Sequence, residues 1–175
     1  MDLMMTTKTK HGHARIGLLG AAAVAVTLAG AIVPAPAQAY RQTITNDLSL
    51  CRGSGPAVQV NVTGIDPARG TIRVQLYRGT KADWLQSGRW LYRIETPAKA
   101  GSMTFCLPVP AAGTYGVAVR HDVNGNGKTD IRTDGGGMSN NPSINVLNLG
   151  KPSYTKTAFP VGDEVKSIAI RMRYM

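Results

Sequence analysis

Short stretches in which apolar and polar residues alternate recur along the chain from residue 57 onward. In "AVQVNVTG" the three valines fall on one side, and in "TIRVQLYRG" Ile72, Val74 and Leu76 do the same. A period of two indicates strands that bury one face. The pattern returns in "SMTFCLPVP", "GTYGVAVRHD" and "VKSIAIRMRYM", and "SYTKTAFPVG" is read as a further strand. No convincing amphipathic helix of ten or more residues follows Tyr40.

Turn residues separate these stretches, and the number of stretches sets the architecture. About seven short strands joined by Gly and Pro turns predict an all-β fold, a single antiparallel β-sandwich of the immunoglobulin or transthyretin-like kind. We assign residues 57–175 to this domain and residues 40–56 to an N-terminal extension. The link "GIDPARG" has the Asp-Pro and Gly of a turn, so the strands on either side of it are predicted to form an antiparallel pair.

Two features concern the surfaces of the sandwich. Both tryptophans, Trp84 and Trp90, lie in the least regular part of the domain, and we expect them to form a lid on the core rather than a platform for a ligand. In "GTYGVAVRHD" the small residues Gly116 and Ala118 share one side. Small residues on one face of a strand predict that another layer approaches that face closely.

The first 39 residues have the three parts of a secretory signal peptide. Lys8, Lys10 and Arg15 form a basic segment, the uncharged residues 16–33 follow, and "PAPAQA" supplies small residues before a cleavage site at Tyr40. An uncleaved membrane anchor is the alternative, because the apolar run is just long enough to span a bilayer. The signal predicts a periplasmic or secreted protein with no transmembrane segment after cleavage.

The chain is basic, with 20 Lys and Arg against 10 Asp and Glu and a formal net charge of +10. The basic residues of the first half of the domain are scattered rather than clustered, from Arg52 to Lys99. A nucleic-acid interface needs a cluster of positive charge, so nucleic acid is not expected as a partner. Association with an envelope polymer or with another protein is the expectation that remains.

Cys51 and Cys106 are the two cysteines, and both follow the predicted signal peptide. In an oxidising compartment such a pair predicts one disulfide, with two free buried thiols as the alternative. A disulfide across a loop of this length contributes about 4 kcal/mol in the chain-entropy account. Neither cysteine lies in a CxxC motif, so a redox role has no support.

The stretch "HDVNGNGKTD" at residues 121–130 carries the chemistry of this sequence. Asp122, Asn124, Asn126 and Asp130 occupy positions 1, 3, 5 and 9 of a calcium loop, and Gly127 occupies the sixth position, where the loop turns sharply. Ca²⁺ takes six to eight oxygen ligands, and alternate side chains of such a loop supply them. We therefore predict a Ca²⁺ site.

Two departures from that pattern predict weak binding. Lys128, at position 7, offers its backbone carbonyl, but Thr133 stands where a bidentate glutamate is usual and Asp134 is one residue late. The expected dissociation constant is on the order of 0.1 to 1 mM, as in extracellular modules. The alternative is a glycine-rich turn in which Asn and Asp bind their own backbone.

Catalytic motifs are nearly absent from the sequence. His121 is the only histidine after the predicted signal peptide, and beside the loop it is expected to orient Asp122 or to cap the strand. We expect no enzymatic activity and predict an exported, non-catalytic binding or structural module. The alternative is a hydrolase acting on carbohydrate or peptide of the cell envelope, with Asp122, Asp130 and His121 as its candidate residues.

Several blocks of the chain resemble the bacterial domain-of-unknown-function family 2141. They are "VNVTGIDPARGTIRVQLY", "FCLPVPAAGTYGVAVRHDVNGNGKTD", "GMSNNP" and "PSYTKTAFPV", and the resemblance covers roughly residues 57–172. It implies an exported small β-sandwich without an established activity. The family's polar motif falls on His121, Asp122, Asn124, Asn126, Gly127 and Asp130. Ser139 and Asn140 would be partners of the loop from a second segment. The chain departs from the family at Gly135 to Gly137, where relatives tend to have a longer or more proline-containing stretch.

Overall fold

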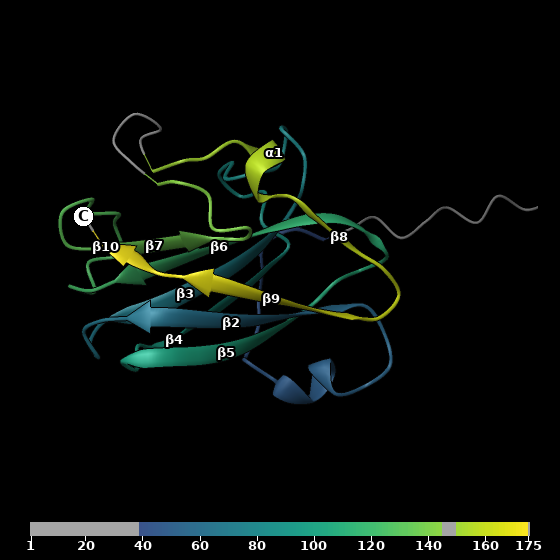
Figure 1. Cartoon of the computed structure of the whole chain (residues 1–175), viewed down its shortest axis with the longest axis horizontal. Helices are drawn as coiled ribbons and strands as arrows, with labels where there is room; N and C mark the ends of the chain where they lie inside the picture. The colour runs from purple at the N-terminus through teal and green to yellow at the C-terminus, as the bar shows by residue number, and fades with distance from the viewer. Residues whose placement is uncertain (1–38, 145–149, 175) are drawn as a thin grey trace, which may run out of the picture. The chain divides into compact units, whose positions relative to one another are not determined.

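The computed structural model describes residues 39–144 and 150–174, so the predicted signal peptide lies outside the described residues apart from residue 39. These residues form two β-sheets (Figure 1), one of seven strands and one of three. The strand order is β1-β4-β3-β6-β7-β10 in the larger sheet, where β8 pairs with β6 off this path, and β5-β2-β9 in the smaller sheet. The all-β, sandwich-like fold is thus confirmed.

The larger sheet consists of β1 (Gln42–Thr43), β3 (Thr71–Arg78), β4 (Tyr92–Pro97), β6 (Gly113–Asp122), β7 (Gly135–Met138), β8 (Phe159–Val161) and β10 (Arg173–Tyr174). The smaller sheet consists of β2 (Ala57–Ile65), β5 (Gly101–Pro108) and β9 (Val165–Arg171). Two short helices complete the description, the 3₁₀ helix η1 (Leu48–Cys51) and the single-turn α1 (Tyr154–Thr157).

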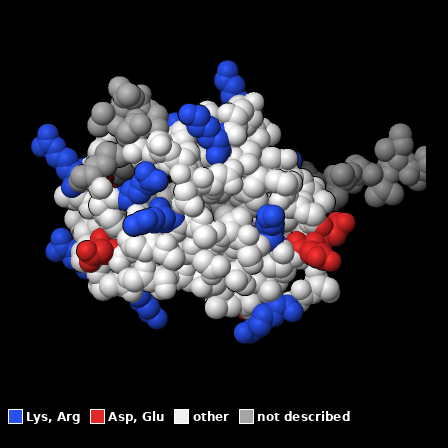
Figure 2. Space-filling model, viewed as in Figure 1, with Lys and Arg blue, Asp and Glu red and all other residues white. Residues whose placement is uncertain are grey.

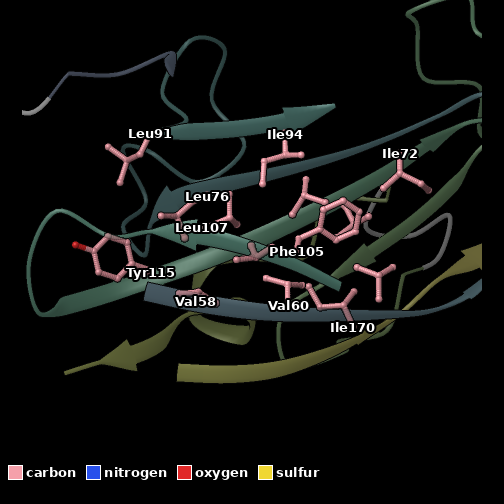
Figure 3. Close-up of a cluster of buried hydrophobic side chains, with 14 of the residues drawn as sticks. Val58, Val60, Ile72, Leu76, Leu91, Ile94, Phe105, Leu107, Tyr115 and Ile170 are labelled. Atoms are coloured by element: carbon pink, nitrogen blue, oxygen red, sulfur yellow. The ribbon is translucent and has the colours of Figure 1, made fainter. Parts of the chain in front are cut away.

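The main core lies between the two sheets, where the alternating apolar residues meet. Figure 3 shows Val58, Val60 and Ile170 of the smaller sheet on the other side of the core from Leu76 and Ile94 of the larger sheet. All five side chains are at most 1% exposed. Each such burial stabilises the fold by about 1.5–3 kcal/mol, so the period-two pattern accounts for most of the core.

The predicted pairing across "GIDPARG" is wrong. β2 pairs with β5 and β9, whereas β3 pairs with β4 and β6, so the link carries the chain from the smaller sheet to the larger one. β2 and β3 each bury one apolar face. Because they lie in two facing sheets, these two faces can pack toward each other in a single core. The sandwich is also not purely antiparallel, because β2 and β9 run parallel, as do β1 and β4.

A second, smaller core lies on the other side of the larger sheet. Trp84 and Trp90 are 5% and 7% exposed and cluster with Tyr77 and Met138. The tryptophans therefore cover this second face instead of closing the main core. A Cβ added at Gly116 would lie 2.7 Å from the Trp84 ring, which confirms the close approach predicted from the small residues of β6.

The segment 40–56 packs along both sheets. β1 pairs with β4, and η1 is tied to β5 by the disulfide between Cys51 and Cys106, whose Cα atoms are 5.8 Å apart. The predicted disulfide is confirmed. Asn46 reinforces the connection, because its side chain accepts a hydrogen bond from the Cys106 N–H and donates one to the carbonyl of Thr104.

On the outer face of the smaller sheet, β2 presents uncharged polar side chains. Gln59, Asn61 and Thr63 of β2 alternate with its buried valines, and Thr104 Oγ1 donates a hydrogen bond to Asn61 Oδ1 across the β2–β5 ladder. In the view of Figure 2 most basic side chains stand apart from one another, although two lie side by side, and acidic side chains occur near the two ends. Within residues 39–144 and 150–174 no helix has the length and apolar character needed to cross a membrane.

Candidate functional site

The predicted calcium loop connects two neighbouring strands of the larger sheet. β6 ends at Asp122 and β7 begins at Gly135, and the strands are paired up to His121 and Gly135. Asp134 closes the base of the loop, since its Oδ1 accepts from the Val123 N–H at 3.1 Å and its Oδ2 accepts from the Asp130 N–H at 3.0 Å. Asp134, which is 6% exposed, therefore holds the beginning of the loop to its end.

The tip of the loop is held by its own side chains. Asn124 Oδ1 accepts from the Asn126 N–H at 3.1 Å, and Asn126 Oδ1 accepts from the Lys128 N–H at 2.7 Å. Asp122 Oδ2 accepts from the Gly127 N–H at 2.8 Å, which places the sixth residue of the motif over the first. Gly127 has a φ of 75°, a conformation that glycine adopts without steric cost.

Asp130 receives two amide groups from the same tip. Asn124 Nδ2 donates to its Oδ2 at 2.9 Å and Asn126 Nδ2 donates to the same oxygen at 2.7 Å. These hydrogen bonds, first from Asn124 and then from Asn126, hold the pKa of Asp130 below its ordinary value. Asp130 is thus an ionised group around which both asparagines are ordered.

Arg120 is the residue that the sequence reasoning missed. Its Nη2 donates to Asp122 Oδ2 and to the Gly127 carbonyl, and its Nη1 donates to the Gly127 carbonyl and to Thr129 Oγ1, all at 3.2 Å. Burial lowers the pKa of Arg120, and the nearby Arg73 lowers it further, while Asp122 opposes the shift. The signal was its position two residues before Asp122, because residues at that spacing share one face of a strand.

One carboxylate oxygen of the loop has no hydrogen-bond partner among the described residues. Asp122 is 5% exposed, and its Oδ1 is buried without a donor, although Oδ2 accepts from Arg120 and Gly127. A buried anionic oxygen without a partner costs free energy unless a cation or donor reaches it. Asp122 Oδ1 is therefore the atom of this loop that most needs a ligand.

The oxygen-rich composition of the loop suits Ca²⁺, but in this conformation the side-chain oxygens do not point toward one common position. The amide nitrogens of Asn124 and Asn126, not their oxygens, face Asp130. Among the described residues no group of three or more His, Cys, Asp or Glu side chains is placed to hold a metal. Calcium at this site would rely on Asp122, Asp130, the Lys128 carbonyl and amides that rotate by half a turn.

His121 lies on the opposite face of β6 from Arg120 and is fully buried. Its Nε2 is 2.7 Å from the Arg69 carbonyl oxygen, so this nitrogen carries the proton, and its Nδ1 is 2.7 Å from the Tyr174 hydroxyl. The Tyr174 oxygen in turn accepts from the Asp66 N–H at 3.0 Å. His121 therefore links β6 to the β2–β3 connection and to β10, and does not contact the loop's carboxylates.

Ser139 and Asn140, implied by resemblance as partners of the loop, lie beside α1 instead. Ser139 Oγ donates to the Thr157 carbonyl at 2.6 Å and accepts from the Val117 N–H at 3.0 Å. Asn140 Nδ2 donates to the carbonyls of Lys156 and Ala158. Of the residues singled out from the sequence, the structure brings Asp122, Asn124, Asn126, Lys128, Asp130 and Asp134 together and leaves His121, Ser139 and Asn140 apart from them.

Comparison with known proteins gives one match. A family model described as "Uncharacterized protein conserved in bacteria (DUF2141)" matches residues 60–169, which include most of β2, the loop and most of β9. No curated protein and no solved structure matches the chain.

Proposed function

The chain belongs to this bacterial family of uncharacterized proteins, and we propose that it is an exported, non-catalytic binding module whose loop at residues 122–134 takes up Ca²⁺ weakly. The observation that carries the calcium proposal is the buried, unpartnered Oδ1 of Asp122. Export is supported by the N-terminal sequence and is compatible with the disulfide between Cys51 and Cys106.

The donor chemistry of the loop supports calcium over a softer metal. Asp122 and Asp130 supply carboxylates, Asn124 and Asn126 supply amide oxygens, and Lys128 supplies a backbone carbonyl. These are the oxygen ligands that Ca²⁺ prefers. The loop offers only two carboxylates, and Arg120 already pairs with one of them, Asp122, so the affinity belongs to the weak, extracellular range.

A binding role also fits the engagement of the candidate catalytic groups. A general base needs a free lone pair within reach of substrate. The single histidine of the described chain has both ring nitrogens in hydrogen bonds, and the unpartnered oxygen of Asp122 is buried out of reach of a substrate. These contacts favour residues that maintain structure rather than residues that transfer protons.

Thermal unfolding of the purified protein in 10 mM CaCl₂ and in EGTA tests the calcium proposal. A ligand that binds only the folded state at a dissociation constant of about 0.1 to 1 mM stabilises it by about 1.4–2.7 kcal/mol at that concentration. For a domain of this size the melting temperature should rise by about 5–9 °C. Asp122→Asn should abolish this calcium-dependent rise, whatever its own baseline stability.

The matched control is Asp163→Asn, which removes the same charge from the exposed turn between β8 and β9. This variant should keep the full calcium increment. The calcium proposal would be refuted if the melting temperature of Asp122→Asn rose as much as that of the unmodified protein, or if the unmodified protein showed no rise at 10 mM CaCl₂. The loop would then be a turn held by its own hydrogen bonds.

A further inference from the structure

Three arginines that lie far apart in the sequence form a row across the larger sheet. Arg73 of β3 is directly opposite Arg120 of β6, Arg120 is opposite Gly136 of β7, and Gly136 is opposite Arg173 of β10. Directly opposed residues of antiparallel strands project from the same face. The three side chains therefore share the face of the larger sheet that points away from the main core, with Gly136 leaving space between two of them.

This row is costly for the sheet. Like charges directly opposite each other destabilise an antiparallel pair, and Arg73 and Arg120 are such a pair. Burial lowers the pKa of Arg93 on β4 as well, and the charge of Arg73 lowers it further. A fourth arginine is therefore close enough to be repelled by this row. The acidic partners are Glu95, which pairs with Arg73, and Asp122, which pairs with Arg120.

A hollow of about 270 Å³ lies over this row. Ala118 and Gly136 are small residues in its floor, and its apolar lining includes Leu85, Ile131 and Met138. Arg73, Arg120 and Arg173 all line it. The volume is near the lower limit of pockets that bind small organic molecules.

The charges around the hollow are unbalanced toward the positive. Lys151 lines the hollow together with the three arginines, and the acidic residues that line the hollow are Asp130 and Asp134. Both carboxylates are already engaged by hydrogen bonds inside the loop. Arg173 and Lys151, in contrast, have no side-chain hydrogen bond or ion pair with another described residue.

We propose that this hollow binds a small organic carboxylate with an apolar body. The carboxylate would accept hydrogen bonds from Arg173, whose planar guanidinium group matches its geometry, and would lie close to the positive charges of Arg73 and Arg120. The apolar body would contact Leu85, Ile131 and Met138. The site adds a ligand class to the binding module and does not require the loop to bind calcium.

Titration of the ¹⁵N-labelled purified protein with benzoate in EGTA tests this proposal by NMR. Benzoate should cause saturable shifts at the backbone N–H groups of Ile131, Gly135 and Gly136, with a dissociation constant on the order of 1 mM. Neutral benzamide, which has the same shape, should bind about tenfold more weakly, because it lacks the charge-assisted hydrogen bonds. Arg173→Gln should weaken benzoate binding by about the same factor.

Arg171→Gln is the matched control, since Arg171 ends β9, carries the same charge and does not line the hollow. It should leave benzoate affinity unchanged. Equal affinity for benzoate and benzamide, equal weakening by the Arg171 and Arg173 variants, or no shifts at 20 mM benzoate would each overturn the proposal. The presence of EGTA separates every outcome from the calcium result.

Discussion

Asp83 and Asp122 are both buried carboxylates, 4% and 5% exposed, and they differ in how well they are satisfied. Asp83 Oδ1 accepts from Tyr40 and Arg89, and its Oδ2 accepts from Thr80. Asp122 has one oxygen engaged and one without a donor. A fully paired buried charge is a structural element, whereas an unfilled one indicates a place for a ligand.

Asp83→Asn should lower the free energy of unfolding at pH 7 by about 1–3 kcal/mol, because it removes the charge that three donors surround. Burial raises the pKa of Asp83, but the hydrogen bonds from Thr80 and Tyr40 and the charge of Arg89 outweigh it and hold that pKa below the ordinary value. The carboxylate's contribution is therefore complete above about pH 3.9 and is lost as the pH falls below that value.

Urea unfolding of both proteins at pH 7 and pH 3 measures this dependence. The difference between the unmodified protein and Asp83→Asn should shrink at pH 3. A difference that is the same at both pH values would show that packing, and not the charge of Asp83, is responsible.

β6 determines the layers of the molecule, because each of its faces meets a different core. Val117 and Val119 are buried in the main core, while Gly116 and Ala118 face the second core around Trp84. Tyr77 of the neighbouring β3 packs edge-on against Trp84, with ring centroids 5.5 Å apart. The Nε1 of Trp84 donates to the Pro152 carbonyl at 2.8 Å, which ties the segment before α1 to this face.

Gly116→Ala should therefore displace the Trp84 ring. The new methyl group would lie 2.7 Å from a ring carbon, and overpacking of this kind costs about 1–3 kcal/mol. Denaturant unfolding monitored by tryptophan fluorescence should give a lower midpoint and an altered native spectrum. Gly162→Ala, where an added Cβ meets nothing within 4 Å, should change the free energy of unfolding by less than about 0.5 kcal/mol.

The disulfide is the one covalent connection between chain segments in the described part of the molecule, and it anchors the segment 40–56 to the edge strand β5. Its 55-residue sequence separation makes it effective in restricting the unfolded chain. That effect concerns the molecule as a whole rather than one contact.

The double variant Cys51→Ala with Cys106→Ala should unfold at lower denaturant concentration, with a loss of about 4 kcal/mol. The same loss should appear when the unmodified protein is reduced. Equal stability of the oxidised and reduced forms would contradict the entropic account of this disulfide. The absence of any free cysteine among the described residues makes the comparison direct.

The sequence predicted what local pattern determines. Strand faces follow from alternation, and the buried Val58, Val60 and Val62 confirm this. Pairing partners depend on where the chain goes after each turn, so a turn signal at residues 66–70 did not reveal that β2 and β3 lie in different sheets. Arg73, Arg120 and Arg173 were unremarkable as scattered charges, because only the register of four strands brings them together.

The loop lies between these extremes. The spacing of its ligand-type residues within one short segment was enough to identify Asp122, Asn124, Asn126 and Asp130 as neighbours. The contribution of Arg120 and the direction of the two amides depend on side-chain orientation, which spacing does not determine. Ser139 and Asn140 were named by resemblance alone, and their contacts with α1 arise from the fold of a later segment.

Both sheets take their last strand from the same short segment. β9 joins the smaller sheet beside β2, and two residues after Arg171 the chain enters the larger sheet as β10, where Tyr174 reaches His121 and Asp66. Neither sheet can be completed before residues 165–174 have been synthesised. A growing chain therefore lacks one strand of each sheet until residues 165–174 have left the ribosome, so the two sheets are completed together, and only after the rest of both has been synthesised.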